Sequence, residues 1–342
     1  MIPVQNIYYM LSYAFQALQT QTYKNLATEN FHNTAELCAA ILDKGVSTQL
    51  KRGLGRDYVP KSESLSTLQG KLNISQSIKT QALLKKQMIC TYDEFSTNTP
   101  FNQIIKSTIL LLLKANITNT RKKSLRNLLL FFSDVDEIDL RFVNWNQRYN
   151  RSNQTYQLLI GICYLVYNGL LQTQTDGTTK IMDFFDEQRM CHLYEKFLLE
   201  YYKKEHPELT ANASQIAWQL DDTENQMLPK MQTDIMLSKG NNILIIDAKY
   251  YSHITQQQYG TNTLHSNNLY QIFTYVKNKE FELRNVEHTV SGMLLYAQTN
   301  EDIIPHNTYQ MSGNQITVRA LNLNQNFSGI ADELDAIINN SF

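Results

Sequence analysis

The sequence predicts an α/β protein whose second half packs helices against a mixed sheet, after a first half of mixed α+β structure. Apolar residues at helical spacing form one face of residues 193–201, which indicates an amphipathic helix. An uninterrupted apolar run at residues 243–246 indicates a buried strand. Residues 238–242, which precede and enter that strand, are rich in types that tolerate a turn, so they are expected to join two hairpin strands.

Periodicity elsewhere predicts further elements in both halves of the chain. In the first half, helices are expected at residues 7–18, 34–42, 99–115 and 122–132, and short strands at residues 46–60 and 68–78. Pro100 follows Asn98 and Thr99, as is typical of a capped helix start. A long apolar helix at residues 154–171 is expected to join the halves, which are predicted as residues 1–150 and 151–342. In the second half, a strand at residues 290–297 and a terminal strand and helix complete the order.

Two carboxylates and a lysine are expected to meet on the hairpin strands. Residues i and i+2 of a strand share a face, so Asp247 and Lys249 point the same way. The turn brings Asp234 beside Asp247. Clustered carboxylates repel each other unless a cation neutralises them, and Mg²⁺ prefers oxygen ligands. Because a neighbouring lysine can orient or deprotonate a metal-bound water or stabilise a pentavalent phosphate, the pattern favours a phosphodiesterase.

The D-x-K triplet alone is a weak signal, since most such triplets are solvated surface charges. Here Asp247 follows a buried strand, where a carboxylate costs free energy unless it is paired or metal-bound. The next expected helix carries Gln271 and Tyr275 at a spacing of four. Glu195 lies beside the apolar stripe of the helix at residues 193–201, and its ordinary interpretation is a surface residue paired with Lys196 or Lys203.

The order of these residues resembles the PD-(D/E)xK nuclease core. Glu195 sits where the first helix of that core carries a glutamate that points at the metal. Gln271 and Tyr275 are similar to a pair in the helix that follows the D-x-K strand in RecB-type members.

A set of seven segments lies at residues 2–15, 50–58, 70–74, 102–108, 228–235, 246–251 and 265–271. They resemble segments of the McrC family and run in the family order, so this closer resemblance extends over most of the chain. McrC proteins are the nuclease subunits of the McrBC 5-methylcytosine-specific restriction system. The sequence after residue 296 matches more loosely.

The resemblance implies a Mg²⁺-dependent DNA endonuclease subunit with a C-terminal PD-(D/E)xK restriction-endonuclease-like core. The implied metal site consists of Asp234, Asp247 and the carbonyl of Ala248. Lys249 would position the attacking water and offset charge in the transition state, while Glu195 and Gln271 would support the metal or the scissile phosphate. Because one such site cuts one strand, a duplex break would need self-dimerisation through the nuclease domain.

The chain has no G-x-x-x-x-G-K-[ST] phosphate loop, so it is not expected to hydrolyse nucleotides by that fold. The resemblance implies a separate motor, an AAA+ GTPase of the McrB type that forms a hexamer and recognises the methylated base. Residues 1–150 would bind this partner and stimulate its GTPase activity. The expected substrate is double-stranded DNA that contains modified cytosine.

Composition limits the way in which such a protein meets DNA. With 342 residues, a net charge of −1 and a pI of about 6.7, it is not expected to coat DNA by bulk charge. The four cysteines lie far apart without a C-x-x-C pair, and the seven histidines show no metal-ligand spacing. No signal peptide or membrane-spanning run is evident, so a cytoplasmic location without membrane contact is expected.

Two other functions stay open at this point. One is a RecB-like DNA repair nuclease that acts without a GTPase, which the McrC-like first half disfavours. The other is a catalytically inert GTPase-activating adaptor, which the intact Asp234, Asp247 and Lys249 disfavour.

Overall fold

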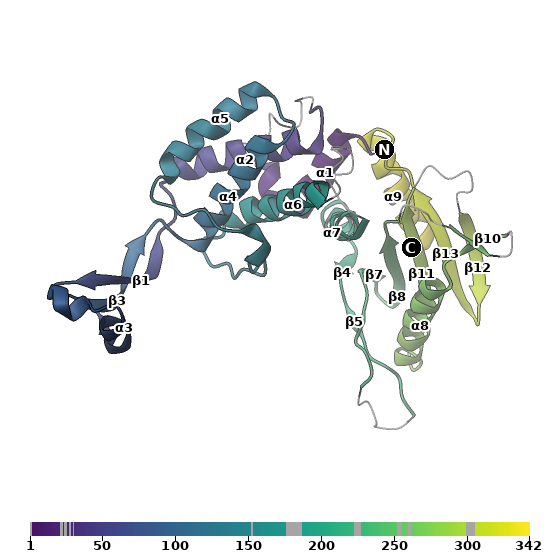
Figure 1. Cartoon of the computed structure of the whole chain (residues 1–342). Coiled ribbons are helices and arrows are strands. Elements are labelled where there is room, and N and C mark those ends of the chain that lie inside the picture. The colour runs from purple at the N-terminus through teal and green to yellow at the C-terminus, as the bar shows by residue number, and fades with distance from the viewer. Residues whose placement is uncertain are drawn as a thin grey trace. The chain divides into compact units, whose positions relative to one another are not determined.

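The chain forms two compact units that do not coincide with the predicted halves (Figure 1). The computed structural model describes residues 2–20, 23, 26, 29, 31–151, 153–175, 187–221, 227–251, 255–258, 261–298 and 305–342. Met1–His32 and Phe185–Phe342 form one unit, called the sheet unit, and Asn33–Phe184 form the inserted unit. The predicted boundary at residue 150 differs from this division, because the first helix and α6 each pack with the other part of the chain.

The inserted unit is built on four helices that share a hydrophobic core. They are α2 (Thr34–Leu50), α4 (Pro100–Lys114), α5 (Asn119–Leu129) and α6 (Tyr156–Thr175). Helix α6 packs against α2 and α4, which places it inside this unit. Helix α4 begins as predicted, with Pro100 in its first turn and the Thr99 side chain accepting a hydrogen bond from the Asn102 amide.

A small sheet with two short helices forms an arm of the inserted unit, which extends away from the four helices of that unit (Figure 1). The arm consists of β1 (Asp57–Leu65), β2 (Lys71–Leu72), α3 (Ile74–Lys79), η3 (Ala82–Lys85) and β3 (Met88–Ser96). Strand β3 lies between β1 and β2 and is antiparallel to both.

The strand predictions in this region are partly wrong. Helix α2 continues to Leu50, so the strand expected at residues 46–60 begins only at Asp57. Buried Gly45 and Val46 lie inside the continuing helix. The strand expected at residues 68–78 is mostly α3, because the Asn73 side chain accepts a hydrogen bond from the Gln76 amide and caps a helix there.

The sheet unit contains a six-stranded mixed sheet, as the α/β prediction requires. Its strand order is β12-β13-β11-β8-β7-β4, and β11 is parallel to both β8 and β13. The strands are β4 (Thr210–Asn212), β7 (Ile235–Lys239), β8 (Asn242–Lys249), β11 (Thr289–Ala297), β12 (His306–Met311) and β13 (Asn314–Leu321). Two short pairs, β5 (Gln215–Ile216) with β6 (Met231–Gln232) and β9 (Thr255–Gln258) with β10 (Thr261–Leu264), lie outside this sheet.

Helices pack against this sheet and fix the ends of its strands. Helix α8 (Ser266–Glu282) buries Ile272 and Val276 against β8, β11 and β13, whereas α7 (Glu187–Glu205) packs against β4, β7 and β8. Gly292 of β11 allows this close approach, since a Cβ atom there would lie 2.8 Å from side-chain carbons of both α8 residues. The contact between α8 and the sheet is therefore tight beside the middle of β8, where Gly292 is the register partner of Ile245.

The first helix, α1 (Val4–Ala14), belongs to the sheet unit and packs against α7. The Asn6 side-chain amide donates to the carbonyls of Leu323 and Gln325 at 2.9 and 2.7 Å, just before α9 (Phe327–Ser341). The Tyr13 hydroxyl donates to Glu205 at the end of α7 at 2.8 Å. These contacts join both ends of the chain in one unit.

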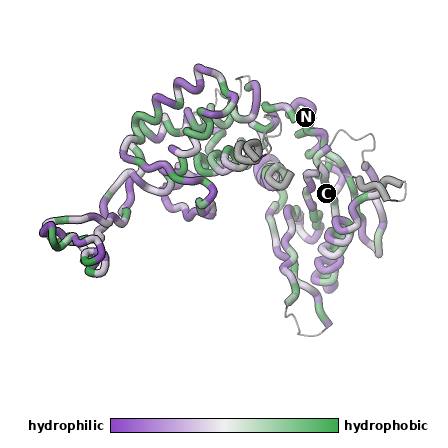
Figure 2. Tube along the Cα trace, in the orientation of Figure 1, coloured by the Kyte–Doolittle hydropathy of each residue, from purple (hydrophilic) through white to green (hydrophobic). Residues whose placement is uncertain are grey.

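The hydropathy of the residues agrees with the packing of the helices. In Figure 2, hydrophobic and hydrophilic residues alternate along the helices of the inserted unit, as expected for amphipathic helices. Within the described residues, no helix combines the length and the apolar character that crossing a membrane requires.

We expect residues 1–32 to be essential for folding of the sheet unit. A chain in which a flexible linker of about 20 residues replaces residues 33–184 should unfold cooperatively, because α1 can then complete the contacts with α7. A fragment of residues 185–342 alone should lose cooperative unfolding, since the apolar faces that α1 covers become exposed.

Thermal unfolding followed by circular dichroism distinguishes the two chains. Equal midpoints for both would show that α1 is dispensable and that the unit ends near residue 185.

Candidate active site

A tight hairpin places the first two predicted site residues side by side. Strands β7 and β8 pair antiparallel from Ile235 with Ile246 to Lys239 with Asn242, and Gly240 in the turn has φ +60°. The backbone amide of Ala248 donates to Asp234 Oδ2 at 2.9 Å. The predicted approach of Asp234 to the end of β8 is therefore confirmed.

Asp247 lies on the side of β8 that faces α8. Side chains alternate along a strand, and Ile243 and Ile245 belong to the core cluster that contains the buried residues of α8. Asp247 and Lys249 continue this face of β8. The buried end of the strand thus carries a carboxylate and an ammonium group where a core side chain would otherwise be expected.

The Asp247 carboxylate is almost completely removed from solvent. Its side chain is 1% exposed, and Lys249 Nζ lies 2.8 Å from its Oδ2 atom. Nevertheless, neither carboxylate oxygen receives a well-directed hydrogen bond from the described residues. Because buried polar atoms normally have partners, these oxygens fit a site that takes up a cation.

A chain of hydrogen bonds fixes the position of Lys249. Lys249 Nζ donates to Gln271 Oε1 at 3.3 Å, and Gln271 Nε2 donates to the Tyr275 hydroxyl at 2.9 Å. The Tyr275 hydroxyl then donates to the carbonyl of Gln232 at 3.0 Å. Gln271 and Tyr275 are one turn apart on α8, as their sequence spacing predicts.

Glu195 of α7 also belongs to this cluster. Its Oε1 atom accepts a hydrogen bond from the Cys191 thiol at 3.0 Å, and its Oε2 atom lies 3.3 Å from His192 Nδ1. The alternative pairing with Lys196 or Lys203 is wrong. Lys203 pairs with Glu200, and Lys196 Nζ lies over the Phe15 ring.

Burial and charge shift the pKa values of the cluster. Burial raises the pKa of the Asp234 carboxyl to about 7, and the neighbouring Asp247 and Glu195 charges add to this effect. Burial also raises the pKa of the Asp247 carboxyl, which the Lys249 charge opposes. Burial lowers the pKa of the Lys249 ammonium, but the two aspartates outweigh it and the net shift is upward.

The oxygen atoms near the end of β8 suit Mg²⁺ better than they suit a metal that needs several side-chain ligands. In the described part of the chain, no three His, Cys, Asp or Glu side chains are grouped closely enough to hold an ion by themselves. Mg²⁺ commonly uses one or two carboxylates and keeps several waters. Asp234, Asp247 and the Ala248 carbonyl can provide such a partial oxygen shell.

Sequence analysis missed two residues that support the site. Cys191 lies one turn before Glu195, and only the helical spacing of four could have indicated their contact. Asn268 of α8 donates to the Tyr296 hydroxyl at 3.0 Å, and Tyr296 is the register partner of Lys249 on β11. The partners in both contacts of Tyr296 lie far apart in the sequence, so no short-range pattern could have indicated them.

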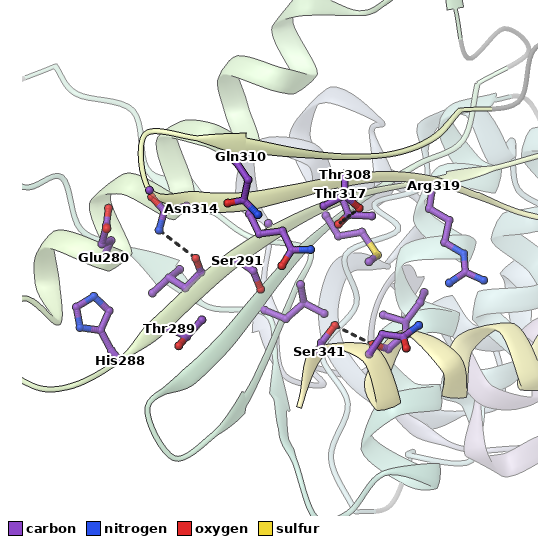
Figure 3. Close-up of a pocket in the computed structure, with 18 of the residues that line it drawn as sticks. Glu280, His288, Thr289, Ser291, Thr308, Gln310, Asn314, Thr317, Arg319 and Ser341 are labelled. Atoms are coloured by element: carbon purple, nitrogen blue, oxygen red, sulfur yellow. Dashed lines mark hydrogen bonds between the residues drawn. The ribbon is translucent and has the colours of Figure 1, made fainter.

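A separate polar groove (Figure 3) lies near the first residues of the parallel strands β11 and β13, whereas Asp247 lies near the last residues of β8. It has a volume of about 480 Å³ and is lined by residues that include Thr289, Asn314 and Arg319. Among its described lining residues Glu280 is the only carboxylate, and Glu280 forms an ion pair with Lys277. The groove therefore lacks the clustered carboxylates that a catalytic metal requires.

We expect Asp234→Asn to stabilise the metal-free protein more at pH 8 than at pH 5. The folded pKa of about 7 lies above the unfolded value of about 3.9. The stability linked to protonated Asp234 is therefore fully present below about pH 4 and is lost as pH rises through about 7. Asn is neutral throughout, so its advantage in melting temperature should grow over this range.

Thermal melts with a chelator present test this expectation, with Asp332→Asn as the control because Asp332 is exposed on α9. An Asp234→Asn difference that does not change between the two pH values would contradict the assignment of a buried, charge-coupled carboxyl.

Three comparisons connect this geometry with known proteins. The family model for the McrBC 5-methylcytosine restriction system component matches residues 4–297. The Escherichia coli K12 type IV methyl-directed restriction enzyme EcoKMcrBC is 31% identical over 339 residues, which cover 97% of this chain and 96% of the relative.

A solved structure has the same fold. It is a half-complex from the tetradecameric assembly of Thermococcus gammatolerans McrB AAA+ hexamers with bound McrC, and the alignment covers 98% of this chain and 76% of that chain. The sequence identity is 16% and the TM-score is 0.52. The resemblance to McrC is thereby confirmed, and the chain belongs to the family of McrBC 5-methylcytosine restriction system components.

Proposed function

We propose that this chain is the Mg²⁺-dependent endonuclease subunit of a modification-dependent restriction complex. The observation that carries the proposal is the buried Asp247 carboxylate, whose oxygens lack well-directed hydrogen bonds from the described residues. It lies beside Asp234 and Lys249 at the end of a buried strand, in the order expected of a PD-(D/E)xK core. Membership of the McrBC family supports a restriction function.

The side chains divide the work of phosphodiester hydrolysis among themselves. Asp234, Asp247 and the Ala248 carbonyl would hold the metal, which would supply a Lewis acid for the phosphate and lower the pKa of a bound water. Lys249 remains an ammonium at neutral pH, since its pKa is raised above the usual 10.4. Its role is thus to orient the attacking water and offset phosphate charge, rather than to remove a proton.

Gln271 and Glu195 support this arrangement from two helices. The hydrogen bond from Lys249 to Gln271 holds the ammonium on the side of β8 that faces α8, next to Asp247. Glu195 adds a third carboxylate that supports the metal or the waters around it.

The inserted unit is proposed to bind an AAA+ GTPase of the McrB type and to stimulate it. The chain has no phosphate loop of its own, and the structurally similar McrC is described as bound to McrB AAA+ hexamers. The arm exposes large hydrophobic side chains, at Leu68, Ile74, Ile78, Leu83 and Leu84. Because exposed apolar patches of this kind mark interaction sites, the arm is the proposed contact surface.

The proposed substrate is double-stranded DNA that contains modified cytosine, in keeping with the methyl-directed relative. A net charge of −1 leaves little non-specific attraction to phosphates, so the partner is expected to provide most of the grip on DNA. Cleavage of both DNA strands requires two active sites, which two copies of the sheet unit provide.

We expect Asp247→Ala to abolish DNA cleavage while GTPase stimulation persists. Mutations in groups that merely support metal ligands cost about 10–100-fold in metal affinity or activity, so loss of a ligand should cost more than about 100-fold. Folding should hold, because Asp234 remains as a negative neighbour of Lys249. Cleavage of methylated duplex with the AAA+ partner and GTP is the measurement.

The same assay decides between the alternatives. Cleavage at the wild-type rate by Asp247→Ala would remove the basis for this site. Cleavage by the wild-type chain without any GTPase would favour a RecB-like nuclease, whereas GTPase stimulation without cleavage by the wild-type chain would favour an inert adaptor.

We expect residues 33–184 alone to stimulate the GTPase and Leu84→Glu to reduce that stimulation by at least about tenfold. Leu84 is 81% exposed on the arm, so a charge there should not harm folding but should oppose an apolar contact. A fragment that ends at residue 150 should be less stable, because it lacks α6. GTP turnover by the partner is the readout.

Leu130→Glu is the matched control, since Leu130 is 75% exposed in the same unit but outside the arm. If Leu84→Glu and Leu130→Glu reduce GTPase stimulation equally, the arm is not the contact surface. If the sheet unit alone stimulates the GTPase, the proposed roles of the two units are reversed.

A further inference from the structure

Cys191 lies between two candidate oxygen groups of the metal site that come from different elements. Its Sγ atom is 3.0 Å from Glu195 Oε1 on α7 and 4.0 Å from the Ala248 carbonyl oxygen on β8. Ala248 also connects to Asp234 through its amide, at 2.9 Å. The thiol therefore touches the only proposed carboxylate of α7 at the point where that helix meets the hairpin.

The thiol can act here only as a weak hydrogen-bond donor. A cysteine thiol with its ordinary pKa of about 8.5 is protonated at neutral pH, and it has one proton to donate. Both neighbours are acceptors, and the carboxylate is the stronger of the two because it is charged. The thiol proton is thus directed to Glu195 in preference to the Ala248 carbonyl.

Few other donors hold the Glu195 side chain. Its second oxygen lies 3.3 Å from His192 Nδ1, but the His192 side chain is 70% exposed, so that contact is weakened by solvent. The Glu195 side chain is 26% exposed, which leaves it room to adopt other rotamers. The Cys191 contact is the more sheltered of the two restraints.

We propose that Cys191 is a positioning residue that holds Glu195 toward the metal site through its S–H hydrogen bond. The inference rests on the proposed function, because Glu195 matters only if a metal binds between α7 and the hairpin. Cys191 is not assigned as a ligand, since Mg²⁺ prefers oxygen donors. Its effect is exerted on a group that supports the metal, as in other metal sites where outer partners orient the inner shell.

The test compares Cys191→Ala with Cys191→Ser in the full-length chain. Alanine removes the donor, whereas serine keeps one in nearly the same place. Mn²⁺ binding is measured by electron paramagnetic resonance of the free ion, without DNA and without reference to activity. We expect Cys191→Ala to weaken Mn²⁺ binding by about tenfold, and Cys191→Ser to stay within about threefold of wild type.

The Mg²⁺ dependence of cleavage provides a second readout. Cys191→Ala should need about tenfold more Mg²⁺ for half-maximal cleavage, with kcat recovered when Mg²⁺ is saturating, because the lost contact acts on metal affinity. Serine should restore the wild-type requirement. Thermal unfolding of both variants gives the effect of the substitutions on packing.

Two outcomes would overturn the inference. Wild-type Mn²⁺ affinity in both variants would show that the thiol merely fills space, and equal weakening in both would show that packing, not the donor, is what matters. The Asp247→Ala variant distinguishes a failure of the Cys191 inference from a failure of the proposed function. If Asp247→Ala binds Mn²⁺ as wild type does, the proposed metal site is wrong. If Asp247→Ala loses Mn²⁺ binding but Cys191→Ala does not, only the role of Cys191 is refuted.

Discussion

The burial of the Asp247 carboxylate at the end of β8 is the constraint on which the site depends. A charge in that position is costly unless a cation compensates it, and Lys249 compensates it only in part. Asp234 lies at the same strand end and adds a second carboxylate, which raises this cost further, while Gln271 contacts Lys249. Under the proposed function, a bound metal would supply the missing positive charge.

The path of the chain places the inserted unit between two helices of the sheet unit. The inserted unit follows α1 in the sequence and precedes α7, and these two helices pack against each other. Helix α7 carries Glu195, and Cys191 of the same helix lies within 4.0 Å of both Glu195 and the Ala248 carbonyl on β8. The candidate site is therefore built partly from the helix that follows the insertion.

Local patterns predicted the parts of the site that depend on local geometry. The i, i+2 rule on β8 predicted that Asp247 and Lys249 share a face, and the hairpin turn predicted the approach of Asp234, whereas spacing did not predict the contact of Gln271 with Lys249. The place of α1 was not predictable, because its contacts with Leu323 and Gln325 span more than 300 residues. Strand β3 was missed as well, since its residues alternate too little between buried and exposed to show a period of two.

The ionisable groups at the end of β8 are unequal in number. Glu195, Asp234 and Asp247 contribute three carboxylates against the single ammonium of Lys249, so the formal charge of the four groups is two negatives when all are ionised. Burial is the largest cause of the raised pKa of Asp234, and the neighbouring Asp247 and Glu195 charges add to it. An excess of buried carboxylates over ammonium groups is an arrangement that a divalent cation would neutralise under the proposed function.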